Sequence, residues 1–106
     1  MSFTLIENSK DLDFLNEELS NKNFLGIDTE FRRTTKNNMK LALLQVNDCE
    51  EIYLIDCLKI TDPVANCSFL FSEKVKKIFH SCREDLDAIF SWTHLEIVNI
   101  FDTQLA

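Results

Sequence analysis

Apolar residues recur along this chain with two spacings, one typical of strands and one typical of a helix. Residues 2–6 predict a short strand. Ser9 would cap a helix that runs to about residue 19, because three leucines share one face of it (Leu12, Leu15 and Leu19). Residues 24–31 form a nearly continuous apolar run that ends in acids, which predicts a buried central strand.

The middle and the end of the chain alternate between strand and helix patterns. Polar residues 32–38 predict a loop. After it we expect strands at 40–46 and 51–57 joined by the Asn47-Asp48 turn, a helix from Pro63 to about residue 71 capped by Asp62, a strand at 75–80, a helix at 82–92 and a strand at 97–101. A meander followed by alternating strands and helices predicts an α/β fold with a mixed sheet flanked by helices.

Composition limits the chain to one domain of 106 residues without a membrane span or a signal peptide, and we therefore expect a cytoplasmic protein. The four cysteines have no C-x-x-C spacing and are interpreted as reduced, buried thiols (Cys49, Cys57, Cys67 and Cys82). The net charge of −7 disfavours a nucleic acid partner held by general attraction. Basic residues gather in two places, at 32–36 and at 74–77. Cations bound by carboxylates would reverse the repulsion locally.

Asp28 and Glu30 are the first candidate site residues. Residues i and i+2 of a strand point to the same side, so both carboxylates would project from one face. Two such charges repel unless a divalent cation such as Mg²⁺ or Mn²⁺, which prefers oxygen ligands, lies between them. Taken alone, the pair fits a solvent-facing strand end equally well.

Asp85 is the more informative acid, because helical periodicity places it in the middle of the apolar arc of 82–92. Glu84 and Asp87 fall on the outer, polar side. An inward acid is costly unless it is paired or coordinated. Residues 81–84 match the S-x-x-E capping box, which would fix the start of this helix. A hydrogen bond to a neighbouring backbone group or arginine is the equal alternative to a metal.

Two further residues are candidates for binding a substrate. Arg33 follows the acid pair and would hold a phosphate, with a solvated loop arginine as the equal alternative. His80 ends a strand and would touch a metal or a substrate, although a hydrogen-bonded structural histidine is the simpler reading. Asp56 and Asp102 are interpreted as turn and capping residues.

Taken in order, these motifs resemble the ribonuclease D family of 3′→5′ exonucleases, within the DEDD superfamily. The first motif reads Asp-Thr-Glu-Phe-Arg-Arg at 28–33 and is followed by Leu-Ala-Leu-Leu-Gln at 41–45. The second motif reads His-Ser-Cys-Arg-Glu-Asp-Leu at 80–86. Leu-Ile-Asp at 54–56 and Phe-Asp-Thr-Gln at 101–104 complete a resemblance that covers essentially the whole chain.

The resemblance implies a ribonuclease H-like fold and a site for two divalent ions, Mg²⁺ or Mn²⁺. Asp28 would bridge both ions, Glu30 would bind the ion that activates water, and Asp85 would hold the second ion. It also implies that the substrate is a single-stranded RNA 3′ end, as in transfer RNA maturation. The family's aromatic residues and proline before its second strand are replaced here by Lys-Asn-Asn-Met at 36–39.

The family's third motif, a tyrosine followed four residues later by an aspartate, would lie beyond Ala106. Tyr53, the one tyrosine, does not match it. The resemblance therefore predicts that 1–106 is the amino-terminal part of a single exonuclease domain, with little or no activity by itself. The alternative function is a catalytically inactive remnant or an accessory module that binds metal or nucleic acid. A thiol sensor is disfavoured, because no cysteine has an activating neighbour.

Overall fold

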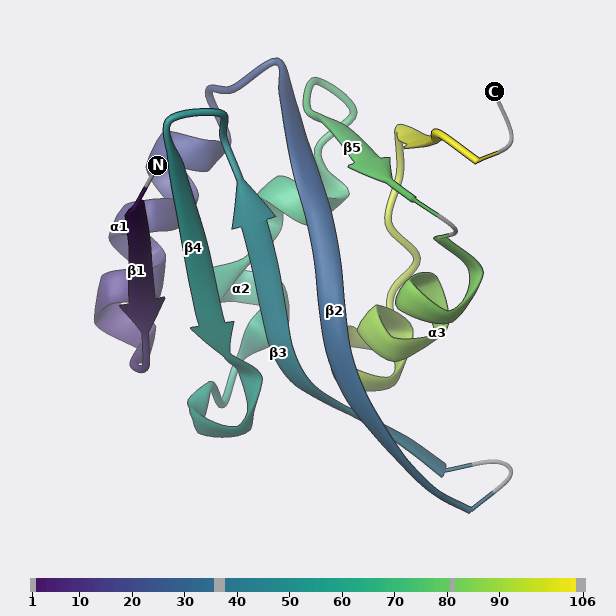
Figure 1. The fold of residues 1–106 in the computed structure, drawn as a ribbon. Helices are drawn as coiled ribbons and strands as arrows, with labels where there is room; N and C mark the ends of the chain where they lie inside the picture. The colour runs from purple at the N-terminus through teal and green to yellow at the C-terminus, as the bar shows by residue number, and fades with distance from the viewer. Residues whose placement is uncertain (1, 36–37, 81, 105–106) are drawn as a thin grey trace.

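The computed structural model describes residues 2–35, 38–80 and 82–104. The elements follow one another along the chain as β1 (Ser2–Ile6), α1 (Ser9–Leu19), β2 (Phe24–Thr35), β3 (Asn38–Asn47), β4 (Glu51–Asp56), the 3₁₀ turn η1 (Cys57–Lys59), α2 (Pro63–Asn66), the 3₁₀ turn η2 (Ser68–Phe71), β5 (Lys76–Phe79), α3 (Cys82–Thr93) and β6 (Ile100–Asp102). Figure 1 shows their arrangement in one twisted sheet with helices behind it.

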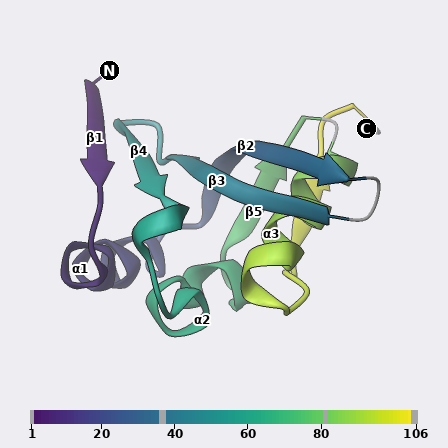
Figure 2. The same ribbon diagram turned by 90° about the horizontal axis from the view of Figure 1, so that it is seen from below.

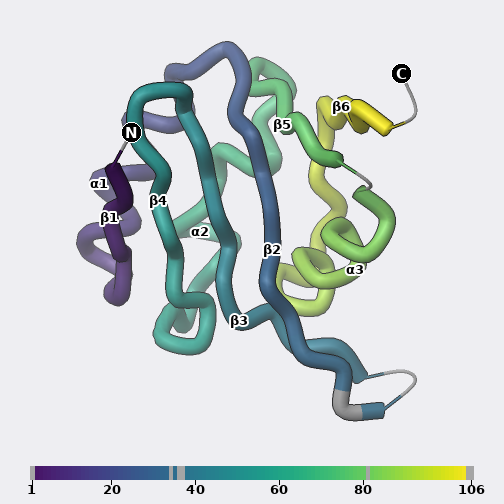
Figure 3. The backbone as a smooth tube through the Cα atoms, in the orientation of Figure 1, coloured from purple at the N-terminus to yellow at the C-terminus, as the bar shows by residue number. Residues whose placement is uncertain are grey.

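The strands form one mixed sheet in the order β1-β4-β3-β2-β5-β6. The central meander β2, β3 and β4 is antiparallel, whereas β1, β5 and β6 each run parallel to their neighbours. The parallel neighbours β5 and β6 are joined by a crossover through α3, and α1 connects β1 to β2 across the sheet. This arrangement confirms the predicted α/β fold with a mixed sheet and an early antiparallel meander. In Figure 3, β1 and β6 lie at opposite edges of the sheet.

All three α-helices of the described chain pack on the same face of the sheet (Figure 2). The side chains of the central strands alternate accordingly, since successive residues of a strand point to opposite faces. On the helix-covered face they are buried (Leu25, Ile27, Thr29, Leu44, Val46 and Ile55). The residues between them lie on the other face, which no described element covers. We call this the open face.

The helix α1 confirms the predicted apolar face, because Leu12, Leu15 and Leu19 are all buried. Its cap differs by one residue from the prediction. Asn8, rather than Ser9, is the N-cap, and its side-chain oxygen accepts a hydrogen bond of 2.8 Å from the backbone N–H of Asp11. Asparagine and serine are comparable caps, so the sequence alone did not distinguish two adjacent candidates.

The predicted loop at 32–38 is wrong. The strand β2 continues to Thr35 and pairs with β3 from Asn38 onward, so the two strands extend past the rest of the sheet as a hairpin arm (Figure 1). Register shifts lie between Glu30 and Phe31 and between Arg33 and Thr35. The arm is polar because it projects into solvent, which removed the apolar pattern that identifies a strand. Lys36 and Asn37 lie outside the described residues.

Two other predicted boundaries also shift. The helix that Asp62 caps ends at Asn66, and a separate 3₁₀ turn follows from Ser68, so the single helix expected to residue 71 is divided. The last strand is shorter than predicted and starts at Ile100. Lys77, one of the basic residues that gather at 74–77 in the sequence, is fully buried on β5. Short elements such as these depend on tertiary contacts more than on local pattern.

The cysteines only partly follow the prediction. Cys57 and Cys67 are buried, Cys82 is half-buried and Cys49 is exposed, and all four are free thiols. Burial raises the pKa of the Cys57 thiol to about 12. Across the described ranges, no helix has the length and apolar character needed to cross a membrane.

Candidate functional site

The open face carries the first two candidate acids, on β2. Asp28 and Glu30 are both exposed there, and Thr29 between them is buried on the opposite side. The Asp28 carboxylate accepts a hydrogen bond of 2.9 Å from the backbone N–H of Thr29. The strand therefore directs two carboxylates to one side and a hydroxyl to the other, as the alternation of a strand requires.

Asp85 lies in the first turn of α3 and faces the sheet. Its carboxylate accepts a hydrogen bond from the hydroxyl of Thr29. Glu84 and Asp87 are exposed on the other side of the helix, as the helical periodicity predicted. Thr29 thus links the two acidic motifs, because its backbone N–H binds Asp28 and its hydroxyl binds Asp85.

The pKa of Asp85 is raised above the ordinary aspartate value, mainly because the carboxyl is partly buried. The hydrogen bond from Thr29 acts in the opposite direction, and the negative charge of Asp28 raises the pKa further. The effect of Asp28 means that the two acids are close enough to interact electrostatically. Two neighbouring carboxylates of this kind favour a cation between them.

A hollow of about 430 Å³ opens on the sheet beside Asp28. It is lined by residues of three strands, β2, β3 and β5, and by the residues that follow β5 and β6 (Gly26, Ile27, Asp28, Gln45, Asn47, Ile78, Phe79, His80 and Thr103). The site candidates Asp28 and His80 therefore share one concave surface, although 52 positions separate them in the sequence. The lining combines carboxylate, amide, imidazole and hydroxyl groups, which can hold a polar ligand.

The two predicted substrate-binding residues each have a partner in the structure. The ring nitrogen Nδ1 of His80 lies 2.9 Å from the hydroxyl of Thr103. A guanidinium nitrogen of Arg33 lies 3.6 Å from a carboxylate oxygen of Glu84, and both side chains are largely exposed. Arg33 is therefore directed from the hairpin arm toward α3, whereas His80 stays at the hollow.

The metal site that the sequence predicted needs three carboxylates together. Among the residues that the structure describes, no group of three His, Cys, Asp or Glu side chains is close enough to hold a metal ion. Asp28 and Asp85 interact, and Glu30 shares the face of Asp28 one residue beyond Thr29. The donors are all carboxylate oxygens, which fit Mg²⁺ or Mn²⁺.

Thr29 and Asp102 contribute to the site in ways that the sequence did not indicate. Both oxygens of Asp102 accept backbone hydrogen bonds of 2.9 Å, one from Cys82 at the start of α3 and one from Gln104. The second bond confirms the predicted role as cap of the following turn. The first connects β6 to the helix that carries Asp85. The capping box expected at this helix start includes Ser81, which lies outside the described residues.

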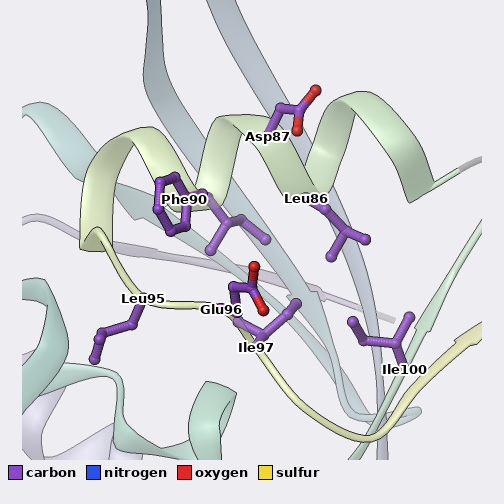
Figure 4. Close-up of a pocket in the computed structure, with 8 residues that line it drawn as sticks. Leu86, Asp87, Phe90, Leu95, Glu96, Ile97 and Ile100 are labelled. Atoms are coloured by element: carbon purple, nitrogen blue, oxygen red, sulfur yellow. The ribbon is translucent and has the colours of Figure 1, made fainter.

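A second hollow, of about 440 Å³, lies between α3 and the segment that leads to β6 (Figure 4). It is lined mostly by apolar side chains (Leu86, Ile89, Phe90, Leu95, Ile97 and Ile100), with Asp87 and Glu96 beside them. Neither Asp28 nor Asp85 lines it. The hollow is thus separate from the acids.

Comparison with known proteins identifies a 3′-5′ exonuclease family and ribonuclease D proteins as relatives of this chain. The family model described as 3′-5′ exonuclease matches residues 3–106. The chain is 32% identical over 104 residues to ribonuclease D of Shewanella sp. (strain ANA-3), covering 98% of this chain and 27% of that protein. It is 46% identical over 65 residues to ribonuclease D of Haemophilus influenzae, covering 61% of this chain and 16% of that protein.

The solved structures agree with the sequence relatives. The crystal structure of Escherichia coli RNase D superposes with a TM-score of 0.91 at 30% identity, covering 99% of this chain and 28% of that one. The chain therefore spans about a quarter of the length of such relatives. Together, the mixed sheet, the order of the acidic motifs and these matches show that the chain belongs to the ribonuclease D-like family of 3′-5′ exonucleases.

Proposed function

We propose that this chain functions in a metal-dependent 3′→5′ exonuclease, which removes nucleotides from RNA 3′ ends, as in transfer RNA processing. The observation that carries the proposal is the link from Asp28 through Thr29 to Asp85, which joins the two acidic motifs across 57 positions. An exonuclease needs carboxylates from different elements at one place, because the scissile phosphodiester and its cations must be held together.

Each residue has a defined task in this proposal. Asp28, Glu30 and Asp85 would hold two divalent cations, Mg²⁺ or Mn²⁺, through their carboxylate oxygens. When bound, such a pair supplies an activated water and stabilises the leaving 3′ oxygen. Thr29 orients the carboxylate of Asp85. His80, at the hollow beside Asp28, and Arg33, on the hairpin arm, would contact phosphates of the substrate.

Two relatives with solved structures support RNA as the substrate. The E. coli protein is an exoribonuclease involved in structured RNA processing. Trypanosoma brucei RNase D, which has the same fold with a TM-score of 0.81 at 22% identity, was solved in complex with RNA U12. The hollow beside Asp28 is where, in this proposal, the 3′ end of the RNA enters.

The proposal is tested with a 5′-labelled single-stranded RNA and Mg²⁺ or Mn²⁺. The 106-residue chain and a longer version that continues through a Tyr-x-x-x-Asp motif are assayed side by side. The longer version should shorten the RNA from its 3′ end, and the Asp28→Ala variant should abolish the shortening. Asp87→Asn, which removes an exposed carboxylate of α3, should leave the rate unchanged. A circular RNA of the same sequence should stay intact.

Two results would contradict the proposal. Shortening that persists in the Asp28→Ala variant would assign the activity to a contaminant. Failure of the longer version to shorten RNA would favour an inactive remnant or an accessory module that binds metal or nucleic acid. A parallel assay with the DNA oligonucleotide of the same sequence measures the preference between the two substrates.

A further inference from the structure

Charge is strongly segregated along this chain. Residues 31–47, which make up the hairpin arm and the rest of β3, contain four basic residues and no acidic one. The chain as a whole has a net charge of −7, so the remaining residues are far more acidic than the average suggests. A basic arm on an acidic domain is the electrostatic pattern that a polyanion recognises.

Two of these basic residues lie side by side on the arm. Arg32 on β2 and Lys40 on β3 are cross-strand partners in the sheet register. Both are exposed, and with Ala42 and Leu58 they line a shallow hollow of about 180 Å³. Like charges placed directly opposite one another destabilise a sheet. The described parts of the chain provide no ion pair for either residue.

The position of Arg32 relates this pair to the acidic site. Phe31 packs against the core and Arg33 reaches Glu84 of α3, so Arg32 between them is directed to the other side of β2. By the same alternation, Asp28, Glu30 and Arg32 occupy the same side of the strand. At about 3.3 Å per residue, Arg32 lies about 7 Å beyond Glu30 along β2 and about 13 Å beyond Asp28.

We propose that Arg32 and Lys40 form a binding site for the phosphate backbone of a single-stranded nucleic acid, upstream of the 3′ end that the acidic site receives. This inference rests on the proposed function, because the acidic site sets which end of the strand lies at Asp28. The guanidinium and ammonium groups bind successive phosphates, and Ala42 and Leu58 give an apolar floor between them. The cost of placing two like charges together is recovered when each of them binds a phosphate.

Fluorescence anisotropy of a labelled oligo(U) RNA tests the inference. The titrations are made in EDTA, so that neither hydrolysis nor a bound cation contributes. The double variant Arg32→Gln/Lys40→Gln should lower the affinity roughly tenfold at low salt. It should also make the slope of log affinity against log salt shallower by about 1.4, because each single-strand phosphate contact contributes about 0.7.

The matched control is Lys10→Gln/Lys74→Gln, which removes two exposed lysines from α1 and from the turn before β5. It changes the net charge equally and should leave both the affinity and the slope unchanged. Equal losses in the two double variants would overturn the inference in favour of a general charge effect. Absence of RNA binding by the unmodified chain would also overturn the inference. So would a result in which the double variant Arg32→Gln/Lys40→Gln loses affinity for anionic lipid vesicles but not for RNA.

The outcome is separable from that of the proposed function. The Asp28→Asn variant should retain the binding in EDTA, because its cation site plays no part there. If Arg32→Gln/Lys40→Gln weakens binding while the longer version of the chain shortens no RNA, the arm is a nucleic acid site and the exonuclease proposal fails. If RNA is shortened but the double variant binds as tightly as the unmodified chain, the arm proposal fails alone.

Discussion

The carboxylate of Asp102 accepts a hydrogen bond of 2.9 Å from the backbone N–H of Cys82, so a residue of β6 caps the helix that carries Asp85. The first N–H groups of a helix have no partner within the helix, and an acid there also interacts favourably with the helix dipole. The position of Asp85 relative to the sheet therefore depends on an element 17 residues further along the chain.

The first prediction concerns this cap. Asp102→Ala should lower the free energy of unfolding by about 1–2 kcal/mol, as loss of a helix cap does. It should also speed amide hydrogen exchange in the first turn of α3. Asp102→Asn keeps one accepting oxygen, so its free energy of unfolding should fall less than that of Asp102→Ala. Denaturant titrations measure the stability, with Asp87→Ala as the control for removing a negative charge. Equal stability of Asp102→Ala and Asp87→Ala would show that the cap contributes nothing.

The second prediction concerns the hydroxyl of Thr29. Thr29→Val keeps the shape of a buried side chain but removes the hydrogen bond to Asp85. The carboxylate then loses a donor, and the free energy of unfolding at pH 7 should fall by about 1.5–3 kcal/mol. The pKa of Asp85 should rise further, because the bond from Thr29 lowers it.

Two comparisons separate this bond from packing. Thr29→Ser retains a hydroxyl and should recover part of the loss. In the Asp85→Asn background, Thr29→Val should cost less than it does in the unmodified chain, because the charged acceptor is gone. The double-mutant cycle gives the coupling between the two side chains directly. A coupling of zero would mean that Thr29 and Asp85 do not interact in solution.

The third prediction is that Mg²⁺ or Mn²⁺ raises the melting temperature, because a ligand of the native state stabilises it by mass action. Asp28→Asn should remove most of this rise. It should also raise the stability in EDTA, because the negative charge of Asp28 disfavours ionised Asp85 nearby. Thermal shifts in EDTA and in each cation provide the measurement. Equal shifts for the unmodified chain and Asp28→Asn would argue against a metal site at this acid.

The sequence predicted most of the strands and a mixed sheet with an early antiparallel meander, because the apolar runs of the central strands are a strong local signal. The position of Asp85 on the inner side of α3 also followed from periodicity alone. The hairpin arm was missed for the opposite reason. Beyond Phe31 its residues are polar on both sides, and only the pairing with β3 makes Arg32 and Arg33 part of a strand.

The contacts within the site were less predictable, since they join residues that are distant in sequence. The alternation that puts Asp28 and Glu30 on one face necessarily turns Thr29, between them, to the other. That its hydroxyl meets Asp85 depends on where α3 packs. The cap from Asp102 to Cys82 likewise requires β6 to lie beside β5.

Lys77 gives the last prediction, because it is a fully buried lysine whose ammonium donates to two backbone carbonyls. Its Nζ lies 2.6 Å from the carbonyl oxygen of Ser72 and 3.1 Å from that of Val98. Burial lowers the pKa of Lys77 to about 8. The unfolded chain, in which lysine has a pKa of about 10.4, therefore holds this proton at pH values where the folded chain has released it.

The sign of the effect follows from that difference. The free energy of unfolding rises with pH wherever the unfolded state binds more protons than the folded state. Below about pH 8, burial of the charged lysine therefore lowers this free energy by its full amount, and the loss is relieved between about pH 8 and 10.4. The relief amounts to on the order of 3 kcal/mol over this window. Burial of Cys57 acts oppositely, because its raised pKa makes stability fall as pH rises.

The difference between the unmodified chain and Lys77→Met cancels the contributions of the other groups. The free energy of unfolding of the unmodified chain, minus that of the variant, should increase from pH 8 to pH 10.4. Denaturant titrations at half-unit pH steps measure it. Lys76→Met, at an exposed lysine of the same strand, is the matched control for the substitution itself. Parallel curves for the unmodified chain and Lys77→Met would mean that Lys77 keeps its proton in the folded state, with its ammonium held by the carbonyls of Ser72 and Val98 despite burial.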